Sequence, residues 1–410
     1  MRWFGNLFWG MQFRRFGKSP QGTDSSPLSL CRFTKNYKSH TAITSIAICF
    51  ANRLRIKCES AIIRHCEIRR IAESKQSTIK SISRIAILFL ALALQTMPLS
   101  ADESFAPNRN HAITILSEND VYFEPLIRSD EYYTGGHFIS YTSPEFENSW
   151  LNYIAGFSHL QDRHFTRFLI SINQELYTPD KKYDYEFKAP TNDILFGAGL
   201  YANLSFISRT RDFMEQFSLD LGVVGPYAFG KQVQNGVHRI TNNREVFGWD
   251  VGTIKNEALI NLHYGLIWRW VFIEDFFDVL PSVQISLGNA LTAINAGAKF
   301  RVGYGIKNDF GMQKLHSRFA QNIVGSGLKV YAFFGVRGSI VGRDIFIEGN
   351  SFGGAKSGAT INRFLYEIEV GAMIGWKYVS FGYIWSDEYK RFKEQRANHK
   401  YGSLRLEIMF

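Results

Sequence analysis

Cysteine is nearly absent from this chain of 410 residues, and all four cysteines lie before residue 67. The rest of the sequence therefore has no disulfide, no cysteine-ligated zinc or iron–sulfur site and no thiol nucleophile. Long apolar runs are also missing, because no stretch after residue 101 approaches 18 residues. A transmembrane helix is thus excluded from that region.

The formal net charge of +10 is confined to one end of the chain. Residues 1–101 hold 16 of the 47 basic residues but only 4 of the 37 acidic ones. Residues 102–410 are therefore slightly acidic. Bulk charge does not indicate a polyanion-binding domain there, and we expect no nucleic-acid partner.

A secretory signal marks the boundary between these two regions. A basic segment from Lys80 to Arg84 precedes an apolar core of ten residues, Ile85 to Leu94, and small residues lead to a cleavage site after Ala101. This core is too short to span a bilayer comfortably. We expect residues 1–79 to be an upstream extension outside the mature protein, 80–101 a cleaved signal peptide and 102–410 the working domain.

Apolar and polar residues alternate with period two along the exported region, as β-strands with two different faces require. The clearest segments are 217–223, 283–287, 364–374 and 404–410. A soluble antiparallel sheet would show the same alternation. The pattern therefore predicts antiparallel strands without deciding between water and lipid.

Three further features favour the membrane. The region is exported without cysteine, aromatic residues cluster near segment ends at 268–272 and 376–378, and the last strand ends on Phe410, which resembles the C-terminus of bacterial outer-membrane barrels. We predict an all-β fold, an antiparallel transmembrane β-barrel of about 12 strands with both termini in the periplasm. The expected location is the bacterial outer membrane, and the expected state is a monomer.

One segment interrupts the strand pattern. A strand ends at Gly225-Pro226, and Gln234 and His238 then stand four residues apart, on one face of a helix if residues 231–240 are helical. A short helix in an extracellular loop is unusual for a plain porin. Glu245 follows shortly afterwards.

A second polar group comes from the first two strands. Asn119 and Asp120 end the first strand, predicted over 112–118, and Thr134 lies where the second strand begins. These residues should meet at one rim of the barrel. Oxygen-rich ligands at a rim suit Ca²⁺ better than zinc.

These residues also carry a resemblance that spans roughly residues 110–410. The sequence resembles the outer-membrane lipid A 3′-O-deacylases in four pieces: Asn119-Asp120, Tyr133-Thr134-x-Gly136, Gln174-x-x-Tyr177-x-Pro179, and the stretch from Gly222 through Gly230 and Val233-Gln234-Asn235-x-x-His238-Arg239-Ile240. The last is the longest and most specific.

The resemblance implies a twelve-stranded, Ca²⁺-dependent barrel that removes the 3′ acyloxyacyl group of lipid A, within the lipopolysaccharide of the outer leaflet. His238 matches the family's catalytic histidine, and Gln234, Asn119, Asp120 and Thr134 match other functional residues. A family lysine falls at Lys181 or Lys182, in a shortened loop. The family's glutamate falls at Glu245 if one residue is inserted.

The residue types suit ester hydrolysis by water. A neutral His238 can accept a proton near pH 7, and Asp120 or Gln234 could fix its tautomer. Ca²⁺ held by Asn119, Asp120 and Glu245 would polarise the carbonyl. Lys181 or Lys182 could pair with a substrate phosphate.

Two alternatives remain open at this stage. The first is an outer-membrane phospholipase with a Ser-His pair. Ser351 lies in a GxSxG pattern at 349–353, but the flexible residues after it do not supply the strand–elbow–helix context of that motif. The second alternative is a non-catalytic porin or structural barrel.

Overall fold

The structure is a computed structural model that describes residues 105–122, 131–147, 150–155, 163–307, 309–319 and 327–410. The expected signal peptide and upstream extension lie outside these residues. In the described ranges no helix is both long and apolar enough to cross a bilayer.

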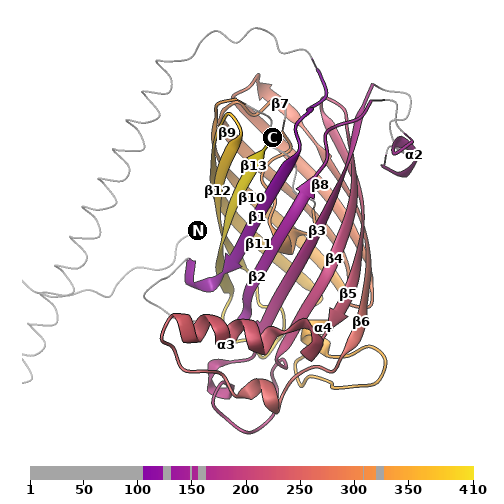
Figure 1. Ribbon diagram of the computed structural model, residues 1–410. Coiled ribbons are helices and arrows are strands. Elements are labelled where there is room, and N and C mark those ends of the chain that lie inside the picture. Colours follow the sequence, from indigo (N-terminus) through magenta and orange to yellow (C-terminus); the bar gives the residue numbers. More distant parts are fainter. Residues whose placement is uncertain (1–104, 123–130, 148–149, 156–162, 308, 320–326) are drawn as a thin grey trace, which may run out of the picture. The chain divides into compact units, whose positions relative to one another are not determined.

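One antiparallel sheet contains all strands of the described residues and closes on itself (Figure 1). The strands are β1 Ala112–Asn119, β2 Tyr132–Thr142, β3 Phe165–Thr178, β4 Gly197–Arg209, β5 Phe213–Val224, β6 Glu257–Trp268, β7 Trp270–Ile273, β8 Phe277–Gly288, β9 Leu291–Tyr304, β10 Lys329–Asp344, β11 Phe364–Trp376, β12 Val379–Glu388 and β13 His399–Met409. Only Arg269 separates β6 from β7, and both pair with β8. They act as one strand of the wall, so the predicted twelve-stranded barrel is confirmed.

The outer face of the wall is largely apolar, whereas the buried inner side carries charged side chains together with apolar clusters, such as the one that contains Leu116, Leu169 and Ile207. In β11, Glu367 and Glu369 are buried, whereas Ile368 and Val370 on the other face are exposed. In β13, Arg405 and Glu407 are buried and Ile408 is exposed. An outer surface of this kind is stable in lipid, where closure pairs the backbone groups of every strand.

The two ends of the barrel differ in their connections. At the terminal end His111 and Phe410 exchange backbone hydrogen bonds, and short turns join β4 to β5 and β11 to β12. The opposite end, the outer end, carries the connections 179–196, 225–256 and 345–363, while the terminal end also has two longer ones, 143–164 and 305–328, of which the second folds back into the barrel. Long loops characterise the extracellular side of outer-membrane barrels.

Helices lie mostly in these connections. The α-helices are α2 Asn152–Ala155, α3 Gly230–Ile240 and α4 Ile345–Glu348, and the 3₁₀ turns are η1 Asp120–Tyr122, η2 Lys181–Tyr183, η3 Pro226–Ala228, η4 Gly248–Asp250 and η5 Leu315–Ser317. Among the described residues the longest helix is α3, which spans eleven residues and confirms the helix predicted for 231–240.

The chain between β9 and β10 folds back into the barrel. Residues 309–319, here called the internal segment, are largely buried. The backbone N–H of Leu315 donates to Glu118 on β1 (2.9 Å), and Lys314 donates to Ser386 on β12 (2.9 Å). Arg318 binds Glu175 on β3 (2.8 Å). A segment that contacts inward side chains from several sides of the sheet lies across the lumen, which the sequence did not predict.

Candidate active site at the outer end of the barrel

The ends of β1 and β2 bring the first predicted site residues together. Asn119 is the last residue of β1, and its Nδ2 donates a hydrogen bond to the backbone oxygen of Thr134 at 3.1 Å. Asp120 follows as the first residue of η1 and has only 2% of its surface exposed. The predicted meeting of Asn119 and Thr134 at one rim is therefore observed.

A β-bulge explains why Thr134 can occupy this position. Tyr133 pairs with Tyr177 and Gly135 with Leu176, so Thr134 is the extra residue on β2. A bulge bends its strand and re-aims the side chain of the inserted residue. The Thr134 hydroxyl lies 2.7 Å from that of Thr178, which links the ends of β2 and β3 beside Asn119.

The helix α3 is set against the barrel wall by its first residues. Phe229, immediately before it, has a left-handed backbone (φ 58°) that turns the chain from η3 into α3. The Gln174 side chain on β3 donates to the Ala228 oxygen at 2.7 Å. A Cβ on Gly230 would lie only 2.6 Å from atoms of Ala198 and Trp249, so glycine permits this close approach.

Two buried side chains then fix the middle of α3. Trp249 Nε1 donates to Gln234 Oε1 at 2.6 Å. Asn235 exchanges two hydrogen bonds with the backbone of Val246, at 2.8 and 3.2 Å. A further ion pair joins Lys231 to Asp250 (2.6 Å). Residues 246–250, which follow α3 in the sequence, thus fold back along α3 and bind three of its side chains.

His238 lies one turn after Gln234, and its ring is oriented by the backbone. Nδ1 is 2.7 Å from the Arg244 oxygen. A carbonyl oxygen can only accept, so Nδ1 carries the proton and the neutral ring keeps its lone pair on Nε2. The Arg244 carbonyl makes this contact with Nδ1, rather than Asp120 or Gln234, the partners considered from the sequence.

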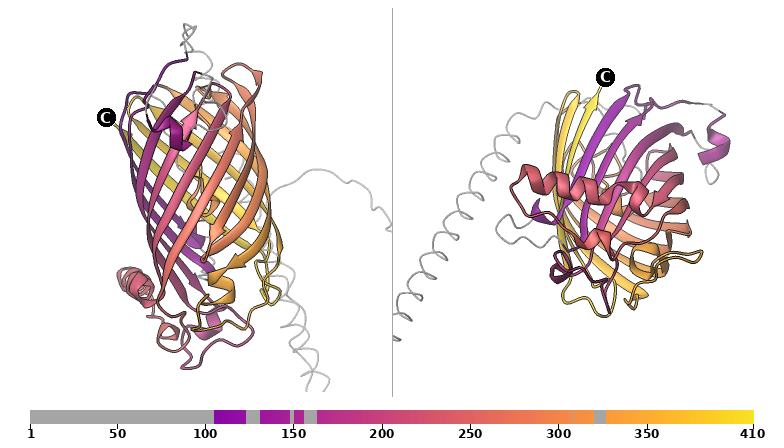
Figure 2. Two further views of the ribbon diagram at one scale, coloured as in Figure 1. Left: turned by 90° about the vertical axis from the view of Figure 1, so that its right-hand side faces the viewer. Right: turned by 60° about the horizontal axis from the view of Figure 1, so that its bottom comes forward.

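The figures show how α3 relates to the strand ends. It begins beside β4 and crosses the outer end towards the side where β1 finishes (Figure 1). In the two turned views it lies outside the wall rather than over the lumen (Figure 2). Its Val237 and Ile240 side chains are exposed. The segment that carries His238 therefore faces the side of the barrel that lipid surrounds.

The two predicted phosphate ligands lie on η2, after β3. Asp180 caps this turn by accepting from the Lys182 N–H at 3.0 Å, and the Lys182 ammonium lies 4.7 Å from the centre of the Tyr183 ring. The Lys181 N–H contacts Glu131 at 3.4 Å. Burial raises the pKa of the Glu131 carboxyl above its usual value, and the Asp180 carboxylate adds to this rise.

The donor atoms at the rim fit a hard cation only in part. The Asn119 amide oxygen and the Asp120 carboxylate are oxygen donors of the kind that Ca²⁺ uses. Glu245 instead forms an exposed ion pair with Arg239 (3.1 Å). No three His, Cys, Asp or Glu side chains of the described residues are grouped so that they could hold a metal ion. Asn119 and Asp120 are therefore the two predicted ligands that the rim itself supplies.

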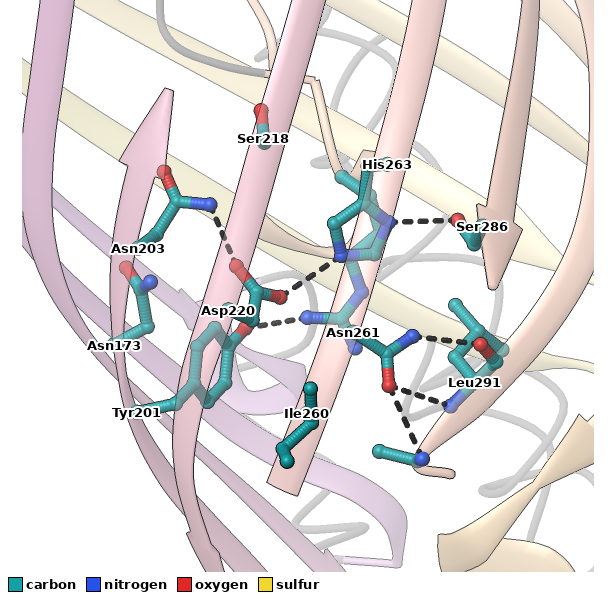
Figure 3. A network of polar contacts seen from close by, with 12 residues as sticks. Asn173, Tyr201, Asn203, Ser218, Asp220, Ile260, Asn261, His263, Ser286 and Leu291 are labelled. Atoms are coloured by element: carbon teal, nitrogen blue, oxygen red, sulfur yellow. Dashed lines mark hydrogen bonds and ion pairs between the residues drawn. The ribbon is translucent and has the colours of Figure 1, made fainter. Parts of the chain in front are cut away.

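A Ser-His-Asp row lies elsewhere, inside the barrel (Figure 3). His263 on β6 is 2.8 Å from the Ser286 hydroxyl and 2.9 Å from the Asp220 carboxylate, which also accepts from Asn203 (2.6 Å). Ser286 has no exposed surface and His263 only 2%. We interpret this row as part of the polar filling of the lumen. The serine considered from the sequence, Ser351 of the GxSxG pattern, donates a hydroxyl hydrogen bond to the Asn289 backbone oxygen (3.2 Å).

Comparison with known proteins agrees with this architecture. The family model described as "Outer membrane protein LpxR" matches residues 88–410. This chain belongs to the LpxR family. LpxR from Salmonella typhimurium has a similar structure, with a TM-score of 0.60 and 22% sequence identity over 73% of this chain and 100% of that chain.

More distant likenesses are to other barrels. The β domain of the Bordetella autotransporter BrkA has a TM-score of 0.34 and 10% identity, over 74% of this chain and 99% of that chain. A comparison with curated proteins gave no match. The family model and the LpxR structure identify the chain as an outer-membrane β-barrel of the LpxR family.

The sequence alone did not reveal all the residues that shape this site. The Arg244 carbonyl is a backbone group without a side-chain signal, and Asn235 stands out in the sequence only as part of the long motif. Its return contact with Val246, eleven residues later, depends on the path of the loop. The place of Asn235 in the long motif, next to Gln234, is the sequence signal that could have pointed to its role.

Proposed function

We propose that this LpxR-family barrel is a carboxylic ester hydrolase that removes the 3′ acyloxyacyl group of lipid A in the outer leaflet. The observation that carries the proposal is the orientation of His238, with its Nδ1 proton on the Arg244 oxygen at 2.7 Å. This leaves Nε2 as the basic nitrogen. The helix that carries it crosses the outer end towards the end of β1.

The chain's own residues can perform the proton transfers. Nε2 of His238 removes a proton from water as the water oxygen bonds to the ester carbonyl carbon. The same nitrogen then returns the proton to the sugar oxygen as the ester C–O bond breaks. No covalent enzyme intermediate is needed. Gln234, held by Trp249 (2.6 Å), keeps the preceding turn of α3 fixed, so that His238 approaches from a constant direction.

The rim would bind the rest of the substrate. Asn119 and Asp120 would hold Ca²⁺, with Glu245 as a third ligand once it leaves Arg239, and Thr134 would keep Asn119 in place. When bound, Ca²⁺ would supply Lewis-acid polarisation of the ester carbonyl. Lys181, or its neighbour Lys182, would pair with a lipid A phosphate as a charge-assisted contact.

The internal segment favours this function over a porin. Lys314 and Arg318 tie it to Ser386 and Glu175, so the segment lies across the lumen in the path that an aqueous channel would take. The serine hydrolase alternative gains no support from the buried Ser286 row. The chemistry then lies on the lipid side of the wall, where an acyl chain is available.

The test is to express the wild type and His238→Ala in a bacterium with hexa-acylated lipid A and to compare lipid A masses. The wild type should remove one acyloxyacyl group, and His238→Ala should be slower by about 10²-fold or more. Gln232→Ala, on the exposed side of the same helix, is the matched control and should retain activity.

Chelation tests the cation separately. EDTA should abolish the reaction of the purified barrel and added Ca²⁺ should restore it. If the wild type leaves lipid A unchanged, the deacylase proposal is wrong. If it releases fatty acid from phospholipids instead, the phospholipase alternative is right.

A further inference from the structure

The strand ends that carry the candidate site are also held from inside the barrel, through Glu118. This glutamate precedes Asn119 on β1 and has no exposed surface. Its Oε1 accepts from the Leu315 N–H of the internal segment and from the Ser403 hydroxyl of β13, both at 2.9 Å. Its Oε2 accepts from the Tyr133 hydroxyl at 2.7 Å. One carboxylate thus joins β1, β2, β13 and the internal segment.

Tyr133 is the second part of this arrangement. It is fully buried and precedes the bulged residue Thr134. The His399 Nε2–H donates to its backbone oxygen at 3.0 Å, and its ring centre lies 5.0 Å from that of His316 in the internal segment. Both its hydroxyl and its backbone are therefore fixed on the lumen side, directly beside the bulge.

Alternation connects these inner contacts with the outer site. Neighbouring residues of a strand point to opposite faces, so Glu118 faces the lumen while Asn119 does not. Asn119 pairs with Gly135 across the strands and Glu118 with Gly136. A shift of Glu118 along β1 would move Asn119 by the same amount and break its contact with the Thr134 oxygen.

Gly136 shows how tightly this arrangement is packed. A Cβ at this position would lie 2.1 Å from the Tyr133 hydroxyl oxygen and 3.1 Å from Leu315 Cδ2. Any side chain would displace the hydroxyl from Glu118. The space taken by the tyrosine hydroxyl gives a physical reason for glycine in the Tyr133-Thr134-x-Gly136 motif.

We propose that Glu118 and Tyr133 are positioning residues for the lipid A reaction, and that the internal segment fixes them through Leu315. They touch no substrate. They set the register of the strand end with Asn119 and Asp120 against the bulge with Thr134, and so the geometry of the cation ligands. This inference rests on the proposed function.

The experiment compares Tyr133→Phe with Tyr264→Phe in the full-length purified barrel. Tyr264 is the matched control because its hydroxyl also donates to a glutamate, Glu215, but on β5 and β6, away from these strand ends. Tyr133→Phe should lower kcat by about tenfold to a hundredfold, the range expected for a displaced catalytic geometry, with little change in KM. Tyr264→Phe should keep the wild-type kcat.

Two more measurements separate positioning from simple stability. Calorimetric titration with Ca²⁺ alone should show weaker binding by Tyr133→Phe than by Tyr264→Phe, whatever the activity. Among Glu118 variants, Glu118→Gln keeps an acceptor of the same shape and should recover most of the kcat lost in Glu118→Ala. Folding is checked by heat-dependent gel migration.

Several outcomes would overturn the inference, and they differ from each other. An inactive wild type would refute the proposed function and this inference with it. An active wild type with equal kcat and Ca²⁺ binding in Tyr133→Phe and Tyr264→Phe would refute positioning alone. If Tyr133→Phe and Glu118→Gln fail to fold while Tyr264→Phe folds, these residues serve the barrel and not the site.

Discussion

Replacing Gly230 by alanine should move α3 away from the barrel wall. The added Cβ would lie 2.6 Å from both the Ala198 Cβ and Trp249 Cη2, whereas ordinary contacts begin near 3.4 Å. Both neighbours are held, Ala198 within β4 and Trp249 by packing on the Phe196 ring, whose centre is 5.3 Å from its own. The helix must therefore withdraw by about 1 Å to restore carbon–carbon contact distances.

The expected consequence is a loss of rate rather than a loss of fold. A displacement of about 1 Å in catalytic geometry can cost about 10²-fold in rate, because His238 travels with α3. We expect kcat of Gly230→Ala on lipid A micelles to fall by about that factor, while the barrel stays folded on heat-dependent gel migration.

Gly236 provides the matched control within the same helix. A Cβ there would meet no atom within 4 Å. Gly236→Ala should keep the wild-type kcat and stabilise α3 by about 0.5–1 kcal/mol, since glycine is a poor helix former. Equal kcat in Gly230→Ala and Gly236→Ala would show that the distance of α3 from the wall does not control the reaction.

Two further predictions concern the rest of the barrel. Burial alone would raise the pKa of Glu145, but the guanidinium groups of Arg167 and Arg209 hold that pKa below its usual value. The charged carboxylate therefore stabilises the terminal end fully above about pH 4.5, and this stabilisation is lost as acid protonates Glu145. Glu145→Gln should lower the free energy of unfolding in urea by roughly 3–5 kcal/mol at pH 7 and reduce the acid dependence of that free energy; an unchanged pH profile would contradict this. The wild-type barrel should conduct no measurable ion current in planar bilayers. Lys314→Ala combined with Arg318→Ala should release the internal segment and give such a current; a double variant without current would show that these two side chains do not hold the segment.

The barrel itself was predictable from the sequence because its strands follow a local rule. Consecutive residues of a strand alternate between the lipid-facing side and the lumen side, as residues 367 to 370 show, so the pattern can be seen in the sequence itself. The helix at 231–240 was also predictable from neighbouring residues, since the four-residue spacing of Gln234 and His238 is that of one helical face. The meeting of Asn119 and Thr134 also followed, because both lie at the ends of strands joined by one connection.

The internal segment and its contacts were not predictable in this way. Residues 309–319 contain only one 3₁₀ turn and no longer element, so they show no regular apolar period, although Phe310, Leu315 and Phe319 pack against apolar residues of the wall. Leu315 and Glu118 are 197 positions apart, and nothing near either residue indicates the other. The same limit applies to His238, whose partner is the backbone of Arg244. Contacts fixed by topology rather than by neighbouring residues require the folded chain.

The pairing of β1 with β13 has a consequence for biogenesis. Thr114 and Glu407, in contact across this seam, are 293 positions apart. Until the last strand has been synthesised, β1 presents an open edge whose backbone groups lipid cannot satisfy. A nascent chain that lacks β13 would therefore have no stable membrane form. Insertion should be a late, all-or-none event that follows the release of the complete polypeptide.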